Sequence, residues 1–289
     1  MPAADRHDAL LSWGASRLRD LPWRSTRDPW AVLVAEVMLQ QTPTARVIPK
    51  YLCFVDRFPT PADCAAAPLA DVLRLWQGLG YPRRARRVQL AATEIVRRGA
   101  FPATLGELLS LPGVGPYTAR AVLAFAFEAD AAVVDTNVAR VLARCAGRRL
   151  TAGEAQRLAD EWLPTGEAWL WNQLLVDLGA TVCRARQPDC TSCPLTGVCA
   201  WRGDPAIADP ADGSAGVSVP QARFEGSDRQ ARGRLLRALA TGALAVDDLP
   251  RAAGLDTDPE RARRLARTLE DDGLVAYSGD GLLVLAGDG

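Results

Sequence analysis

Four closely spaced cysteines constrain this chain more than any other feature of its sequence. They follow the spacing C-x6-C-x2-C-x5-C and are Cys183, Cys190, Cys193 and Cys199. Four thiolates at such short separations can surround one metal ion or one cluster, which forces the intervening loop to fold back on itself. The spacing alone leaves a four-iron cluster and a tetrahedral zinc ion as alternatives.

Length and composition indicate a globular protein of one large domain or two smaller ones. The chain has 289 residues, of which 48% are hydrophobic, so it can bury a sizeable core. Its 34 basic residues balance 34 acidic ones, so nucleic-acid binding would need local clusters and backbone donors. The N-terminus lacks a signal peptide and no apolar stretch approaches the roughly 20 residues that span a bilayer. We therefore expect a cytoplasmic protein that contacts no membrane.

The other cysteines and the histidine receive simpler interpretations. Cys53, Cys64 and Cys145 lie in apolar helical segments and are expected to be buried thiols. A cytoplasmic location also argues against a disulfide framework. The single histidine, His7, is expected to lie in a frayed terminus, which disfavours histidine-dependent catalysis.

Proline and glycine divide the chain into short helices, so the fold class is mainly α. Helical segments are expected over residues 8–19, 31–40, 43–58, 61–77, 83–99, 105–111, 118–128 and 136–146, and two more within 151–180. Residues 203–222 are rich in Ala, Asp, Pro, Gly and Ser and are interpreted as a linker. Beyond it, helices over 228–240, 246–253 and 259–271 and a hairpin of 274–277 with 282–285 predict a small winged-helix-like α+β module. The arginines of its third helix could face DNA or solvent.

A glycine hairpin occupies the middle of the chain, where residues 111–119 read LPGVGPYTA. Two glycines two residues apart form a tight turn, and their bare N–H groups can lie against a phosphate at a helix N-terminus. The predicted DNA-backbone contacts are Gly113, Val114, Gly115 and Thr118. An ordinary linker between two helices is the alternative interpretation.

Two carboxylates stand out as candidates for chemistry. Glu36 interrupts a helix that is apolar nearly all round, where burial raises the pKa of a carboxyl and allows it to act as a general acid. A structural ion pair with an arginine is the alternative. Asp135 stands where an N-cap residue belongs, ahead of residues 136–146. Backbone N–H groups at a cap favour the ionised form, so we expect a fixed negative charge there.

An aromatic side chain precedes a basic cluster on a flexible turn. Tyr81 follows Gly78 and Gly80, and arginines occupy four of the positions 83–87. A tyrosine beside basic residues suits insertion between stacked bases. A tyrosine that covers the core and a solvated helix face are the alternatives.

Taken together, these motifs resemble the MutY-type adenine DNA glycosylases of the helix-hairpin-helix superfamily, which also contains endonuclease III. The resemblance covers roughly residues 8–200 and rests on LPWR at 21–24, EVMLQQT at 36–42, GLGY at 78–81, the glycine hairpin, DTNVARVL at 135–142 and the cysteine loop. It implies a six-helix part over roughly 30–135 and an iron-sulfur subdomain formed by the N-terminal helix with 136–202. The whole glycosylase domain would span residues 1–202. Residues 223–289 lack the Nudix-like domain of many relatives and resemble the shorter end of actinobacterial members.

The resemblance also implies roles for individual residues. Glu36 would protonate the flipped-out adenine and Asp135 would stabilise the sugar cation, with Tyr117 and Asn137 positioning these groups. The adenine pocket would be lined by Trp23, Arg24, Leu39 and Gln173, and Gln41 and Tyr81 would lie against the opposing base. Arg184 and Arg186 would point toward phosphate. The four cysteines would hold a [4Fe-4S] cluster.

The implied activity is hydrolysis of the adenine glycosidic bond in double-stranded DNA, with adenine opposite 8-oxoguanine or guanine. Endonuclease III-like relatives carry a strand-cleaving lysine where this chain has Tyr117, so a monofunctional enzyme is expected. We also expect it to be a monomer associated with the nucleoid. A T·G mismatch glycosylase, an endonuclease III-like lyase and a non-catalytic DNA-binding iron-sulfur protein are the competing hypotheses.

Overall fold

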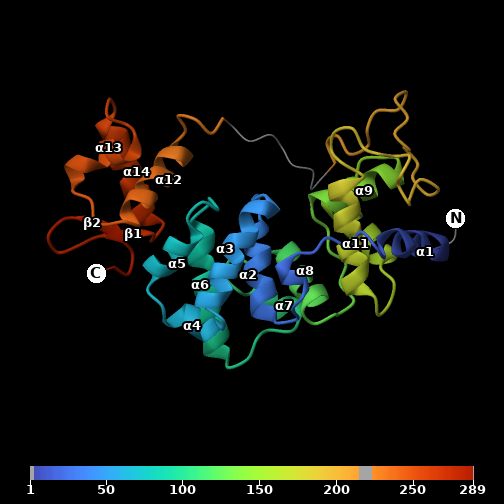
Figure 1. Ribbon diagram of the computed structural model, residues 1–289, viewed down its shortest axis with the longest axis horizontal. Coiled ribbons are helices and arrows are strands. Elements are labelled where there is room, and N and C mark those ends of the chain that lie inside the picture. Colours follow the sequence, from blue (N-terminus) through green and yellow to red (C-terminus); the bar gives the residue numbers. More distant parts are fainter. Residues whose placement is uncertain (1–2, 215–222, 289) are drawn as a thin grey trace. The chain divides into compact units, whose positions relative to one another are not determined.

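The computed structural model describes residues 3–214 and 223–288, which form two compact units. Within these residues the first unit contains 3–32, 103–109 and 114–214, and the second contains 33–102, 110–113 and 223–288. Helices dominate both units, as Figure 1 shows, and the strands described are a single antiparallel pair. The expected mainly α fold is therefore confirmed. None of the described helices is long and apolar enough to cross a membrane.

The first unit packs around one buried helix, α11 (Ala168–Thr181). Its elements are α1 (Ala3–Gly14), η1 (Pro22–Arg24), the first turn of α2 (Pro29–Leu39), α7 (Leu105–Leu109), α8 (Pro116–Phe125), α9 (Thr136–Ala146), α10 (Ala152–Trp162) and α11 (Ala168–Thr181). Trp171, Leu174 and Leu178 of α11 pack with Leu142 of α9 and Leu10 of α1. Helix α10 begins with a reciprocal capping box between Thr151 and Glu154, which satisfies two otherwise unpaired backbone N–H groups.

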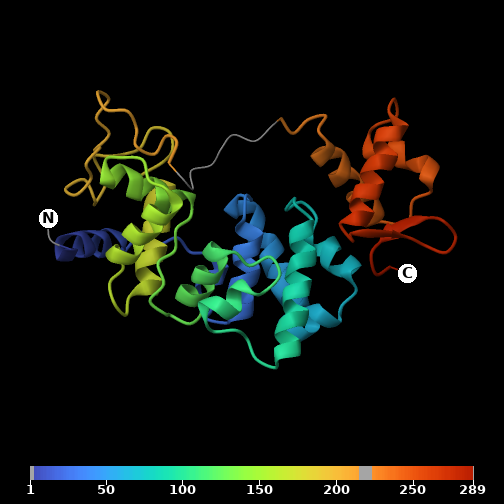
Figure 2. The same cartoon turned by 180° about the vertical axis from the view of Figure 1, so that it is seen from behind.

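The second unit contains the remaining part of α2 and four further helices in its N-terminal segment. They are α3 (Thr44–Arg57), α4 (Pro61–Ala66), α5 (Leu69–Trp76) and α6 (Arg83–Arg98). In Figure 2 the long teal helix is α6, which packs against α4 and α5. The single helical segment expected over 61–77 is two helices, because Pro68 disfavours helical backbone at the preceding residue, Ala67.

The C-terminal module, residues 223–288, has the predicted winged-helix-like architecture. Its helices are α12 (Asp228–Leu239), α13 (Leu249–Ala253) and α14 (Pro259–Asp271), with a short η2 (Val246–Asp248). Strands β1 (Val275–Tyr277) and β2 (Leu283–Leu285) pair with Val275 opposite Leu285, and a bridge from Leu244 to Leu283 extends the pairing. Helices α12 and α14 lie against this hairpin in Figure 1, and α13 packs on both of them.

Three expectations from the sequence are corrected. His7 is not frayed: its ring stacks on Trp171 and lies 3.0 Å from a carboxylate oxygen of Glu167. Cys53 is exposed on α3, whereas Cys64 and Cys145 are buried as expected.

The third correction concerns the expected linker. Residues 203–214 pack on the first unit through an ion pair between Asp209 and Arg144 and through the buried side chains of Ala211 and Ser214. The remainder of that segment, residues 215–222, lies outside the described residues.

Candidate functional site

Glu36 lies in one of the most deeply buried helices of the chain. Every residue of α2 from position 30 to position 38 is buried, and Glu36 itself is 4% exposed. The apolar residues of α2 pack the helix into the core, and this packing also removes the Glu36 carboxyl from solvent. The expectation of a buried carboxyl in α2 is confirmed.

Arg84 ties the C-terminal end of α2 to the turn that carries Tyr81. One guanidinium nitrogen donates to the carbonyls of Val37 at 2.8 Å and Met38 at 3.2 Å, which α2 leaves without helical partners. The other donates to the carbonyls of Leu79 at 3.0 Å and Gly80 at 3.1 Å. Burial lowers the pKa of Arg84 to about 10, so it remains a cation at neutral pH.

This arginine was missed as a functional residue in the sequence, although a signal for it exists. Arg84 falls in helical register with the buried residues Val88, Ala91 and Ile95, so its side chain had to be buried on α6. The periodicity therefore distinguishes it from the exposed arginines around it.

Gln41 and Tyr81 share an unusual backbone conformation. Their φ angles are +55° and +48°, in the left-handed region that glycine favours, and both residues are exposed. They lie on the two loops that Arg84 joins, and Thr42 adds a hydrogen bond from its hydroxyl to the Leu79 carbonyl at 3.1 Å. Strained residues of this kind cost of the order of 1–3 kcal/mol and cluster at functional sites.

Asp135 is the N-cap of α9, as predicted. Its Oδ1 accepts from the backbone N–H groups of Asn137 at 2.9 Å and Val138 at 2.7 Å, and its Oδ2 accepts from Asn137 Nδ2 at 2.8 Å. The Asn137 amide is fixed in turn by Arg140, which donates to its Oδ1 at 2.9 Å. Arg140 therefore orients the Asn137 amide, and this amide in turn orients the Asp135 carboxylate.

The expected ionisation of Asp135 needs a correction. Burial raises the pKa of Asp135, and the hydrogen bonds from Val138 and Asn137 and the charge of Arg140 only partly oppose this effect. Desolvation of the carboxylate is the largest of these effects and outweighs the capping bonds.

The glycine hairpin has the backbone that its sequence requires. Gly113 has φ +82°, and a Cβ built there would lie 2.8 Å from the Cβ of Arg87, so only glycine fits. Gly115 is the N-cap of α8 and Pro116 is its first residue. Thr118 is 2% exposed and Val114 is buried, so any contact they make with DNA would use backbone N–H groups. Tyr117 is half-buried on α8.

The predicted adenine-pocket residues are distributed over both units. Trp23, Arg24 and Gln173 are buried in the first unit, whereas Leu39 is half-buried in the second. The guanidinium of Arg24 forms a bidentate pair with Asp177, with both N–O distances at 2.8 Å. The sequence analysis did not identify Asp177. The signal for it was its position as a single aspartate within the apolar run of α11.

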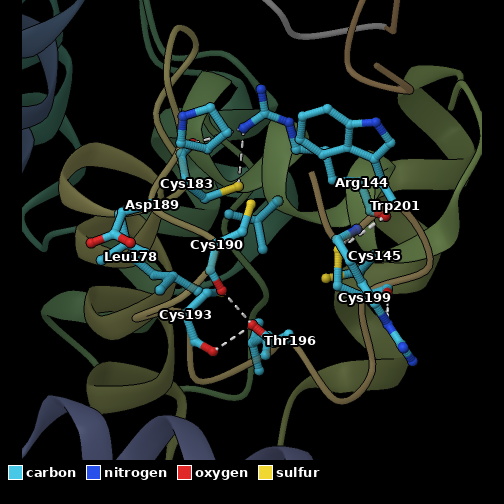
Figure 3. Close-up of a pocket in the computed structure, with 15 residues that line it drawn as sticks. Arg144, Cys145, Leu178, Cys183, Asp189, Cys190, Cys193, Thr196, Cys199 and Trp201 are labelled. Carbon is cyan, nitrogen blue, oxygen red and sulfur yellow. Dashed lines mark hydrogen bonds between the residues drawn. The ribbon is translucent and has the colours of Figure 1, made fainter. Parts of the chain in front are cut away.

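The cysteine loop forms a cavity in the first unit. The four predicted ligands line it together with Cys145, Arg144 and Trp201, as Figure 3 shows. Arg144 donates to the Cys183 sulfur at 3.2 Å, and the Arg202 N–H donates to the Cys199 sulfur at 3.3 Å. Such donors favour thiolate sulfur, so the donor set fits an iron-sulfur cluster.

Among residues 3–214 and 223–288, no three His, Cys, Asp or Glu side chains form a group that could hold a metal ion. A hydrogen bond from Cys145 lowers the pKa of the Cys199 thiol to about 6. Burial raises the pKa of Cys193 to about 11 and also raises those of Cys183 and Cys190.

Comparison with known proteins defines the class first. Residues 34–165 match the HhH-GPD superfamily of base excision DNA repair proteins. A solved thermostable thymine-DNA glycosylase is similar over 69% of this chain and 97% of its own, with 28% identity and a TM-score of 0.64. A solved non-covalent endonuclease III-DNA complex is similar over 70% and 97%, with 27% identity and a TM-score of 0.61. The fold and its helix-hairpin-helix element thus define a DNA glycosylase that acts in base excision repair.

The particular family follows from a full-length relative. The adenine DNA glycosylase of Mycobacterium tuberculosis is 43% identical over 292 residues, which cover 97% of this chain and 93% of that protein. The chain belongs to the adenine DNA glycosylase family. The resemblance drawn from the sequence motifs is confirmed, and it extends through the C-terminal module.

Proposed function

We propose that this enzyme hydrolyses the N-glycosidic bond of adenine placed opposite 8-oxoguanine or guanine in double-stranded DNA, without cleaving the strand. The observation that carries the proposal is the burial of Glu36 in α2, in a chain whose full-length relative is an adenine DNA glycosylase. Adenine leaves poorly unless it is protonated, so the reaction needs an acid shielded from water.

The reaction begins when the adenine is turned out of the base stack, because its glycosidic bond is unreachable within the duplex. Glu36 donates a proton to a ring nitrogen of adenine, the bond to the sugar breaks, and positive charge develops on the sugar ring. The carboxylate then assists the attack of water. A buried carboxyl suits the first step because desolvation favours its neutral form before the transfer.

Asp135 stabilises the sugar cation. Asn137 and Val138 hold its carboxylate in one orientation, so little reorganisation is needed when the charge appears. The ionised form does this work, and the raised pKa of Asp135 places the acid limb of activity above the ordinary aspartate range.

Tyr117 supports hydrolysis over strand cleavage. A strand-cleaving relative needs an amine that forms a Schiff base with the sugar, and a phenol cannot supply one. The backbone N–H groups of Gly113, Val114, Gly115 and Thr118, in the hairpin and the first turn of α8, would hold a DNA phosphate. Gln41 and Tyr81 would lie against the base opposite the adenine.

The four cysteines would hold a [4Fe-4S] cluster in the cavity beside Arg144. When bound, the cluster would order the loop over residues 183–199 and supply no step of the hydrolysis. Arg144 would neutralise sulfur charge and link the loop to α9 and Asp209.

The test is a single-turnover assay on three duplexes that hold adenine opposite 8-oxoguanine, thymine opposite guanine, or thymine glycol. Adenine release from the first duplex alone, with intact strands, is expected. The likeness to a solved thymine-DNA glycosylase makes the second duplex the sharpest competitor. Absence of adenine release from the first duplex would overturn the proposal.

A further inference from the structure

The C-terminal module contacts the chain on both sides of the turn that carries Tyr81. We call residues 78–81 the Tyr81 turn. Immediately before it, Gln77 donates its side-chain amide to the Leu236 carbonyl of α12 at 3.2 Å. Two residues after it, Arg83 forms an ion pair with Asp272 at the end of α14. The module therefore holds both flanks of one short turn.

Helices α5 and α6, which flank the Tyr81 turn, make further contacts with the module. Arg74 of α5 donates to the Ala240 carbonyl at 3.3 Å and pairs with Asp288 near the end of the module. Arg86 of α6 packs on Gly273, where a Cβ would lie 2.8 Å from the guanidinium carbon. Gly273 has φ +63°, so glycine is required there by backbone conformation as well.

The basic cluster at the start of α6 is consequently used within the protein. Arg83 and Arg86 contact the C-terminal module, Arg84 binds the carbonyls described above, and Arg87 packs on Gly113 of the hairpin. The sequence left open whether this cluster contacts nucleic acid or forms a solvated helix face. The structure gives each of its four arginines an internal partner.

Asp272 is built to keep its charge. Its side chain is 6% exposed and accepts from Arg83 and from Arg232 of α12. Burial alone would raise the pKa of Asp272, but the hydrogen bonds from the two arginines outweigh it and hold the pKa below its usual range. The contact between module and turn is therefore charged on both sides at neutral pH.

We infer that the C-terminal module positions the Tyr81 turn against the base opposite the adenine and so contributes to discrimination of that base. The inference rests on the proposed function for its substrate. Tyr81 keeps an unfavourable left-handed backbone, and such a conformation persists only where the surroundings over-determine it. Arg84 restrains the turn from inside, and Gln77 and Arg83 restrain its ends.

The first experiment is a double-mutant cycle in the full chain with Arg83→Ala, Asp272→Asn and both together. Matched controls are Arg97→Ala, at the far end of α6, and Asp271→Asn, the exposed neighbour of Asp272. Single-turnover excision is measured with adenine opposite 8-oxoguanine and opposite guanine. We expect each single variant to lower the ratio of the rate constant opposite 8-oxoguanine to that opposite guanine about fivefold. The double variant should lower this ratio little further, because the two residues contact each other and their effects are not additive. The controls should leave the ratio unchanged.

A direct phosphate contact by Arg83 would give a different result. Arg83→Ala would then weaken binding to every duplex alike and reduce the slope of log affinity against log salt by about one, whereas Asp272→Asn would have no effect. That outcome, or an unchanged ratio in both single variants, would overturn the inference. Arg83 is largely exposed, so its variant removes the contact without disturbing the fold of the module.

The second experiment needs no substrate. Hydrogen–deuterium exchange of the amides over residues 78–84 is compared among the same variants. Faster exchange in Arg83→Ala and Asp272→Asn, but not in Asp271→Asn, is expected; equal exchange in all would overturn the inference. If the wild-type chain released no adenine from any duplex, the proposed function would fail while this measurement still decided whether the module holds the turn.

Discussion

Asp135 shows how a single residue can serve the fold and the chemistry together. Its carboxylate caps α9 through two backbone N–H groups and is fixed by the Asn137 amide. The sequence predicted the cap from the residue type and its place before a helix. It did not predict the direction of the pKa shift, because burial at this position is produced by packing within the first unit.

Replacing Asp135 by Asn should separate the two roles. Asparagine caps helices about as well as aspartate, so the free energy of unfolding should change by less than about 1 kcal/mol. Excision should fall by at least about a hundredfold, because the charge that stabilises the sugar cation is lost. Urea unfolding and single-turnover excision measure the two effects, with Asp135→Ala as the variant that loses both. Full activity in Asp135→Asn would assign the residue to the cap alone.

Replacing Glu36 by Gln should abolish base excision and leave binding to the mismatched duplex largely intact. Glutamine keeps the size of the side chain but cannot donate the proton that the leaving adenine needs. A gel-shift assay checks binding, and single-turnover kinetics check release. Retained turnover would place the acid elsewhere in the chain.

At the scale of elements, two arginines join segments that are distant in the sequence. Arg84 connects α2 with the Tyr81 turn, and Arg24 connects η1 with α11 through Asp177, which lies 153 positions away. Helices, caps and breaks were predictable because their signals are local. The partners of Arg84 and Arg24 were not predictable, because the residues next to an arginine do not identify a distant carbonyl or carboxylate.

Replacing Arg84 by Lys should destabilise the second unit by at least about 2 kcal/mol, because one ammonium cannot reach carbonyls on both segments and buried acceptors lose their donors. Urea unfolding measures the loss. Arg97→Lys on the exposed face of α6 is the matched control and should change stability by less than about 0.5 kcal/mol. Equal stability of the two variants would show that the Arg84 fork is dispensable.

The Arg24–Asp177 pair should make stability depend on pH in a defined direction. Bonds from Arg24 and Arg19 overcome the effect of burial and hold the pKa of Asp177 below its usual range. The stabilisation is therefore complete above the unfolded-state pKa of about 3.9 and is lost as the pH falls through the lower folded value.

Asp177→Asn should cost about 3 kcal/mol at pH 7, because it leaves a buried guanidinium without its counter-charge. The difference from wild type should shrink below pH of about 4. Asp160→Asn, which breaks an exposed pair with Arg120, is the control and should cost less than about 1 kcal/mol. A difference that stayed constant down to acid pH would show that ionisation of Asp177 does not matter.

At the scale of the whole molecule, the family motifs and the winged-helix-like module were predictable, whereas the place of the module was not. Its hydrophobic periodicity identified its helices and hairpin, since these depend on neighbouring residues. Its grouping with residues 33–102 depends on contacts such as Arg83 with Asp272, which no local pattern reveals. The same limit applies to residues 203–214, whose composition suggested a linker although Asp209 binds Arg144.

The cysteine loop should make the folding of the first unit depend on iron. Protein purified without oxygen should be brown and contain about four iron atoms per chain. Removing the iron with a chelator should speed hydrogen–deuterium exchange over residues 183–202 and leave exchange over the C-terminal module unchanged. A colourless native protein with stoichiometric zinc would contradict the cluster assignment.

The second unit is assembled mainly from two segments far apart in the sequence, residues 33–102 and 223–288, and most of the first unit is encoded between them. During synthesis the ribosome must therefore make residues 103–288 before the second unit can close, which takes roughly 9–37 s at about 5–20 residues per second. Residues 33–102 lack their C-terminal partner throughout that interval. A chaperone that shelters them, or a slow stretch of codons that lets the first unit fold beforehand, would raise the yield of active enzyme.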